Sequence, residues 1–235
     1  MLFSYFDRIY ILNLPQRVDR LQATVKELES VGIDLEHEKV KIFPAIKPDT
    51  LEPFHKLGSK GCFLSVLEIL KRSREESLKN VLIFQDDIKF VPGFKDYEQD
   101  LVEQLKQKKW DIVQFGYFLS HRISPQANKH APVSLTDCSE NLIGAHCFAV
   151  NGDSFDAFIT FLEDLLKRPR DHPMGGPMPI DGAFNVFRQR NKNIVRLIAV
   201  PSMAGQRSSR SDVTPSWFDH VPLLSKLIES LRRLK

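Results

Sequence analysis

Two adjacent carboxylates, Asp86 and Asp87, follow a short apolar run and a glutamine, Gln85. Two aspartates that leave a strand point in different directions, so one can bind a cation while the other contacts a ribose or orients a neighbour. Mg²⁺ and Mn²⁺ prefer such oxygen ligands together with phosphate oxygens, and they offset the charge of a diphosphate leaving group. Aspartate is also favoured at the start of a turn. The pair therefore indicates either a metal-diphosphate site or a simple turn.

Two further side chains could accept a proton. Asp181 follows a segment rich in proline and glycine and begins a helical pattern, where the helix terminus keeps a carboxylate ionised. There it could serve as the general base toward an acceptor hydroxyl, or it could only cap the helix. His146 is a second candidate base, although a lone histidine within an apolar strand is more often a core residue.

The spacing of apolar residues predicts the elements that would position the acidic pair. Strands are expected at 8–14, 40–46 and 81–84, and helices at 18–32 and 61–77. This alternation predicts an α/β fold with a mostly parallel central sheet and helices on both faces. Ligands of such sheets bind beyond the carboxyl ends of the strands, and residues 85–87 stand at such an end.

The second half of the chain predicts further elements of the same domain. They are a helix at 94–105, strands at 111–115 (ended by Gly116), 146–151 and 194–200, and helices at 153–167 and 180–189. Residues 50–60, 119–141 and 168–179 are expected as loops, and the segment 119–141 is long enough to serve as a lid. Because no repeat or linker interrupts the pattern, we expect one domain over residues 1–215.

Residues 216–235 form a separate segment with a basic amphipathic pattern over 222–235. Such a helix could lie on an anionic membrane surface, as would suit an enzyme that acts on lipid-linked glycans. More often, such a helix packs on its own domain or on a partner chain.

Composition excludes several classes of protein. The 235 residues carry a net charge of only +3 with basic side chains spread along the chain, so no nucleic-acid partner is expected. Three cysteines without C-x-x-C spacing predict neither a disulfide framework nor a zinc site. No apolar run reaches the length of a signal peptide or a membrane span. We therefore expect a cytoplasmic protein, with peripheral membrane contact as its only membrane association.

Four segments also occur in a characteristic order between about residue 8 and residue 213. They are Ile11-Leu12-Asn13-Leu14 with Arg17 and Asp19-Arg20; Gly61-Cys62-Phe63-Leu64-Ser65; Val81 to Ile88; and Gly144-Ala145-His146-Cys147-Phe148 with Pro179-Ile180-Asp181 and Gln206…Ser211-Asp212. Each motif is weak alone, but their order and spacing resemble glycosyltransferase family 25, which includes lipooligosaccharide and collagen galactosyltransferases.

The resemblance implies a single-domain, Rossmann-like GT-A fold and an inverting transfer from a nucleotide sugar, typically a UDP-hexose. It implies Mn²⁺ or a similar ion such as Mg²⁺, and a glycan, lipid-glycan or protein acceptor. Asp87 would be the metal ligand, with Asp86 supporting the ribose or the metal beside Gln85. Asn13, Arg17 and Arg20 would bind the nucleotide, and an arginine suits a diphosphate through its two-pronged hydrogen bonding. The late residues that would close over the diphosphate are Gln206, Arg207 and Ser211.

Three positions depart from the family pattern. Gln85 stands where the family has glutamate, Val66 where it has histidine, and Ser59 where it has an acidic residue. The loss of charge at Gln85 bears directly on metal affinity and donor choice. An alternative therefore stays open, in which the chain is a degenerate member that binds a sugar nucleotide or glycan without transfer. Paired aspartates also occur in response-regulator phosphoacceptor domains, but the long segments after residue 150 fit those poorly.

Overall fold

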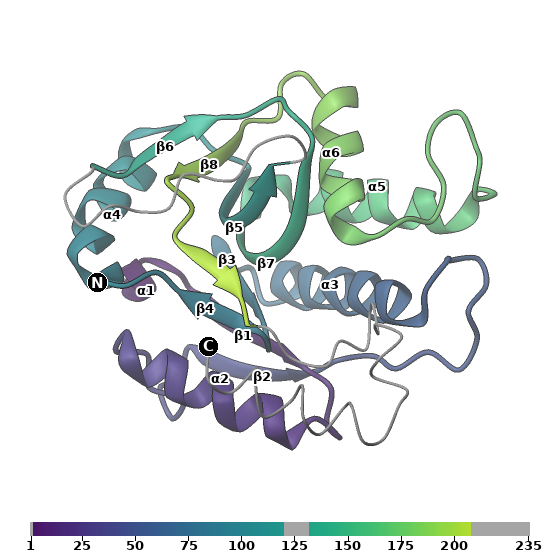
Figure 1. Ribbon diagram of the computed structural model, residues 1–235. Coiled ribbons are helices and arrows are strands. Elements are labelled where there is room, and N and C mark those ends of the chain that lie inside the picture. Colours follow the sequence, from purple (N-terminus) through teal and green to yellow (C-terminus); the bar gives the residue numbers. More distant parts are fainter. Residues whose placement is uncertain (1, 120–131, 208–235) are drawn as a thin grey trace.

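One sheet runs through the part of the chain that the computed structural model describes, residues 2–119 and 132–207 (Figure 1). Its central strands lie in the order β2-β1-β3-β7-β5-β8-β6. Their bounds are β1 Arg8–Asn13, β2 Val40–Pro44, β3 Asn80–Gln85, β5 Ile112–Leu119, β6 Ser134–Asp137, β7 Leu142–Asn151 and β8 Arg196–Val200. Two short strands, β4 (Ile88–Phe90) and β9 (Ala204–Gln206), pair with each other, and β9 also pairs with β5.

Most of these strands run in the same direction, which confirms the predicted sheet. β1 pairs in parallel with β2 and β3, and β5 pairs in parallel with β8. β7 lies antiparallel between β3 and β5, so β5 again runs in the direction of β3. Only β7 and the edge strand β6 oppose the others among the seven central strands.

Helices cover both faces of the sheet because its strands are apolar on both sides. In β1, Ile9 and Ile11 face one core while Tyr10 and Leu12 face the other, as expected for side chains that alternate along a strand. The first core lies against α1 (Leu2–Tyr5), α2 (Val18–Ser30) and α4 (Glu98–Gln107). The second lies against α3 (Leu57–Glu75), α5 (Phe155–Lys167) and α6 (Ile180–Arg190).

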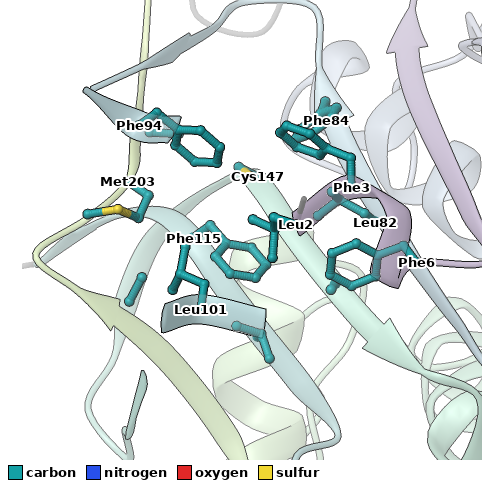
Figure 2. Close-up of a cluster of buried hydrophobic side chains, with 14 of the residues drawn as sticks. Leu2, Phe3, Phe6, Leu82, Phe84, Phe94, Leu101, Phe115, Cys147 and Met203 are labelled. Carbon is teal, nitrogen blue, oxygen red and sulfur yellow. The ribbon is translucent and has the colours of Figure 1, made fainter. Parts of the chain in front are cut away.

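The first core is rich in aromatic side chains that join distant parts of the sequence. Figure 2 shows Phe3, Phe84 and Phe94 grouped together in this cluster. The rings of Phe3 and Phe94 stack with centroids 5.7 Å apart, and Phe3 meets Phe84 edge-on at 6.2 Å. Aromatic pairs of this kind add to the stabilisation from burial. They tie the N-terminal residues to β3, the strand that ends at the acidic pair.

Several element boundaries differ from the sequence-based expectation. α3 begins at Leu57 rather than at Gly61, so its first turn reaches into the segment expected as a polar loop. β5 continues through Gly116 to Leu119. Gly116 is required there because a Cβ would lie 2.5 Å from the His146 ring on β7, so this glycine accommodates a neighbour and does not end the strand. Strand β6 also lies within the stretch expected as a loop.

Some predictions fall outside the described residues. They are Ser211, most of the expected lid at 119–141, the boundary at 215 and the helix at 222–235, all of which stay predictions. None of the described helices combines the length and the apolarity needed to cross a bilayer.

Candidate active site

Asp86 is held by two side chains from the N-terminal part of the chain. Its Oδ2 accepts a hydrogen bond from Asn13 Nδ2 at 2.8 Å, and its Oδ1 forms an ion pair with Arg20 Nη1 at 2.8 Å. Asp86 is buried, with 7% of its surface exposed. Because both carboxylate oxygens have a partner, the position of Asp86 at the end of β3 is fixed by β1 and α2.

Asp87 faces a different environment, although it is the next residue. Its carboxylate oxygens lie 3.4 and 3.3 Å from the amide nitrogen of Gln206, which is longer than either contact at Asp86. Burial raises the pKa of Asp87, and the adjacent Asp86 raises it further, while Arg20 opposes both effects. Because its contact with Gln206 is long, the second aspartate is the carboxylate better placed to bind a ligand.

Arg207 fixes the turn that carries both aspartates. Its backbone N–H donates to Asp87 O at 2.6 Å, and its guanidinium donates to Ala23 O at 2.9 Å and to Asp86 O at 2.6 Å. Thr24, which is fully buried on α2, donates to Asp86 O at 2.7 Å and accepts from Arg207 at 2.9 Å. Helix α2 and the segment after β9 are thus joined to the backbone carbonyls of the acidic turn.

A cleft of about 990 Å³ opens beside the acidic turn, and Asp87 and Asp181 both line it. Asp181 lies in the first turn of α6, where its Oδ2 accepts from Gly144 N–H at 2.8 Å and its Oδ1 from Gly182 N–H at 2.9 Å. Cys62 also lines the cleft, and its thiol is within electrostatic range of both carboxylates. Burial and these two charges raise the pKa of Cys62 to about 12. Two carboxylates from distant segments therefore share one cleft.

Comparison with known proteins identifies the family. The model of "Glycosyltransferase family 25 (LPS biosynthesis protein)" matches residues 6–151, which include Asn13, Arg20 and the acidic pair. The chain belongs to glycosyltransferase family 25.

The relatives of this family-25 chain include a named galactosyltransferase and a protein described as probably inactive. It is 30% identical over 210 residues to a "Glycosyltransferase 25 family member" of Drosophila melanogaster, covering 80% of this chain and 31% of that one. It is 30% identical over 129 residues to "Procollagen galactosyltransferase 1-A" of Xenopus laevis, covering 47% and 21%. It is 26% identical over 208 residues to a "Probable inactive glycosyltransferase 25 family member 3" of Rattus norvegicus, covering 80% and 34%. The chain spans about a third of the length of the curated relatives it matches.

A solved structure shows the same fold. It is described as a "glycosyltransferase involved in the glycosylation of the major capsid of PBCV-1", and it matches with a TM-score of 0.51 at 12% identity. The match covers 87% of this chain and 95% of that one. The α/β glycosyltransferase fold expected for family 25 is thereby confirmed.

The structure corrects the second candidate base of the family-25 chain. His146 is fully buried and does not line the cleft, and its Nε2 lies 3.0 Å from Ala204 O. Burial lowers the pKa of His146 to about 4, so the ring stays neutral at physiological pH. It packs over Gly116 and against Phe118, with ring centroids 5.3 Å apart for the latter pair. These contacts make His146 a core residue, the interpretation that its apolar strand already favoured.

Four of the predicted nucleotide-binding residues have partners within the protein. Asn13 is 3% exposed and Arg17 forms an ion pair with Asp19 at 2.9 Å; neither lines the cleft within the described chain. Arg20 and Arg207 do line it, but both bind the acidic turn. Asn13, Arg20 and Arg207 thus position the aspartates through these contacts. Thr24 is the member of this set that sequence reasoning missed, since a threonine within an amphipathic helix carries no recognisable signal.

A divalent cation fits the acidic turn only together with substrate oxygens. The described residues contain no group of three or more histidine, cysteine or acidic side chains that could hold a metal by themselves. Asp87 supplies a carboxylate. The amide nitrogen of Gln206 contacts this carboxylate and lies 3.4 Å from Gln85 Oε1, so Gln85 supplies a neutral oxygen nearby. Mg²⁺ and Mn²⁺ are commonly bound by one or two carboxylates plus phosphates. Asp87 could therefore hold such an ion against a bound diphosphate.

Proposed function

We propose that this chain is a metal-dependent, inverting glycosyltransferase that moves a hexose from a nucleotide sugar to a hydroxyl acceptor. The donor would be UDP-galactose or UDP-glucose, and the acceptor a glycan, a lipid-linked glycan or a protein. One observation carries the proposal: Asp87 and Asp181 open into one cleft within a family-25 fold. The galactosyltransferase description of the Xenopus laevis relative supports the choice of sugar.

The two carboxylates suit different parts of the reaction. Asp87 would bind Mn²⁺ or Mg²⁺, and the cation would offset the negative charge that develops on the departing nucleoside diphosphate. Asn13, Arg20 and Arg207 would keep this carboxylate in place through their contacts with the acidic turn.

Asp181 would take the proton of the acceptor hydroxyl as its oxygen bonds to the anomeric carbon and the bond to the diphosphate breaks. Two backbone N–H groups orient the carboxylate, and each oxygen keeps a lone pair for a further partner. A base held in this way can act on a hydroxyl only within hydrogen-bond reach. The shared cleft supports this role, because an acceptor bound next to the donor would lie in the cleft that Asp181 lines.

A donor-hydrolysis screen tests the proposal. Release of nucleoside diphosphate from a panel of nucleotide sugars would be measured with Mn²⁺ and with chelator, for the wild type and for Asp87→Asn and Asp181→Asn. We expect Mn²⁺-dependent release that Asp87→Asn abolishes and that Asp181→Asn reduces about a hundredfold or more when an acceptor is supplied. Asp19→Asn, an exposed carboxylate outside the cleft, is the control. Release of nucleoside diphosphate that needs no Mn²⁺ and is unchanged in Asp87→Asn would overturn the proposal.

A second candidate is a family member that binds a nucleotide sugar without transferring it. The neutral Gln85 favours it, since one charge expected beside the metal is missing, and one relative is described as probably inactive. Calorimetry separates the two candidates: donor binding without product over a broad acceptor panel supports the second. Gain of turnover in Gln85→Glu would trace the deficiency to this residue.

A further inference from the structure

Helix α3 begins inside the cleft without a cap. Its N-cap residue, Lys56, makes no side-chain cap, and its first turn contains no acidic residue. Leu57, Gly58 and Ser59, which form this turn, all line the cleft. The first N–H groups of a helix have no partner within the helix and carry partial positive charge, so they attract anions.

Ser59 provides an independent sign that this helix end receives a ligand. Only 7% of Ser59 is exposed, yet its hydroxyl has no hydrogen-bond partner within residues 2–119 and 132–207. Two other buried serines of α3 behave differently: Ser65 donates to Gly61 O and Ser73 to Ile69 O, each at 2.7 Å. The Ser59 oxygen is not among the fully enclosed polar atoms that lack a partner, so it is open to the cleft that it lines, and its unpartnered hydroxyl is suited to a group supplied from there.

Basic side chains surround the same part of the cleft. Lys47, His55 and Lys56 line it, are exposed, and form no ion pair within the described residues. The loop before α3 is held close to the helix, since Ile46 N–H donates to Ser65 Oγ at 2.8 Å. Gly61 permits this approach, because a Cβ there would lie 2.4 Å from Ile46 O. Lys47 and Lys56 thus place positive charge on the wall of the cleft that Ser59 also lines.

We propose that the N-terminus of α3 is a second anion-binding subsite, which takes a carboxylate or phosphate group carried by a sugar of the substrate. The sugar is either the one transferred or the one that accepts it, and this part rests on the proposed function. The acidic residues of the cleft, Asp86, Asp87 and Asp181, come from the β3 turn and from α6. The subsite is therefore distinct from the carboxylates that would bind the cation and take the proton.

The first test needs no nucleotide and no turnover. Amide signals of Leu57, Gly58 and Ser59 would be followed by NMR during titration with methyl β-glucuronide and with neutral methyl β-glucoside. We expect the glucuronide to shift these signals and to bind about tenfold more tightly, as charge-assisted bonds at a helix terminus allow. Equal shifts and equal affinities for the two glycosides would overturn the proposal.

A charge-reversal variant makes this test specific to the helix end. Ser59→Asp places a carboxylate in the first turn of α3, where it favours helix formation, so the fold should be kept. We expect it to abolish the preference for the glucuronide. Gln99→Glu adds the same charge to the first turn of α4, outside the cleft, and should leave the preference unchanged. A preference that survives Ser59→Asp would contradict the proposal, and an unfolding midpoint equal to wild type would confirm that the variant is folded.

Two calorimetric arms identify the source of the anion. Preference for UDP-glucuronate over UDP-glucose, lost in Ser59→Asp, would assign the group to the transferred sugar. Preference for methyl β-glucuronide in the presence of saturating UDP, with no preference among donors, would assign it to the acceptor. If UDP itself fails to bind, the proposed function fails, while the nucleotide-free titration still decides whether the subsite exists.

Discussion

The same substitution should lower stability at Asp86 but not at the adjacent Asp87. Asp86→Asn removes the charge that pairs with Arg20 at 2.8 Å in a site where both side chains are about nine-tenths buried. The guanidinium then faces a neutral amide, whose NH₂ group competes with it as a donor. Loss of a buried, charge-assisted hydrogen bond costs about 2 to 3 kcal/mol of unfolding free energy. For a chain of this size that is a decrease of roughly 4–12 °C in midpoint.

Asp87→Asn should leave stability unchanged or increase it. Burial raises the pKa of Asp87 above its ordinary value of 3.8, so the charged form is disfavoured in the folded state. The stability that this group contributes is complete below pH 3.8 and is lost as the pH rises through the raised value. The advantage of the Asp87→Asn variant over the wild type should therefore be absent in acid and complete at neutral pH, in metal-free buffer.

Denaturant unfolding with chelator present, at neutral pH and near pH 4, measures both effects. Asp19→Asn is the matched control. Asp19 pairs with Arg17 but remains 63% exposed, and such exposed ion pairs contribute at most about 1 kcal/mol to the free energy of unfolding. If Asp86→Asn behaved like this control, Asp86 would not be the fixed anchor of the turn. If Asp87→Asn lost as much stability as Asp86→Asn, the division of roles between the two would be wrong.

Contacts near the cleft give three further predictions. Gly116→Ala should cost about 1–3 kcal/mol in denaturant unfolding, since its Cβ would lie 2.5 Å from the His146 ring; a loss below about 0.5 kcal/mol would show that the strands can shift apart. The pKa of Cys62, raised to about 12, leaves little thiolate at pH 7. Its thiol should therefore react with a disulfide reagent about a thousandfold more slowly than free cysteine at pH 7, and faster as the pH rises; a rate like that of free cysteine would refute the raised pKa. Arg207→Met should lower the free energy of unfolding by about 1–3 kcal/mol, because Thr24 and the backbone carbonyls of the acidic turn lose this donor. It should also weaken UDP binding. If both values stayed unchanged, Arg207 would not position the acidic turn.

The sequence predicted the features that depend on the residues of a single strand or helix. The apolar runs that became β1 and β3 are buried on both faces, so their composition alone predicts inner strands, and the acidic pair then had to stand at a strand end. The helical spacing before Gly32 ended where expected, with Gly32 at a φ of +84°. These features depend on local chemistry that a single segment carries.

Features that depend on a distant partner were not predictable in the same way. Strands β4 and β9 have three residues each and exist because residues 88–90 pair with 204–206. The side chain of Arg207 is of the type that binds phosphate, but its Nη1 and Nη2 groups donate to α2 and to the acidic turn. Whether an arginine meets phosphate or protein is decided by what lies within reach in three dimensions. The uncapped start of α3 was not predicted either, because residues 50–60, which include Ser59, were expected as a loop.

Calorimetry of UDP binding with and without Mn²⁺, on the wild type and on Asp87→Asn, tests the proposed metal-diphosphate site most directly. We expect Mn²⁺ to strengthen UDP binding to the wild type by about tenfold or more, and Asp87→Asn to remove this dependence while UDP alone binds both proteins equally. UDP affinity that is the same with Mn²⁺ and with chelator, or a Mn²⁺ dependence that persists in Asp87→Asn, would contradict this role of Asp87.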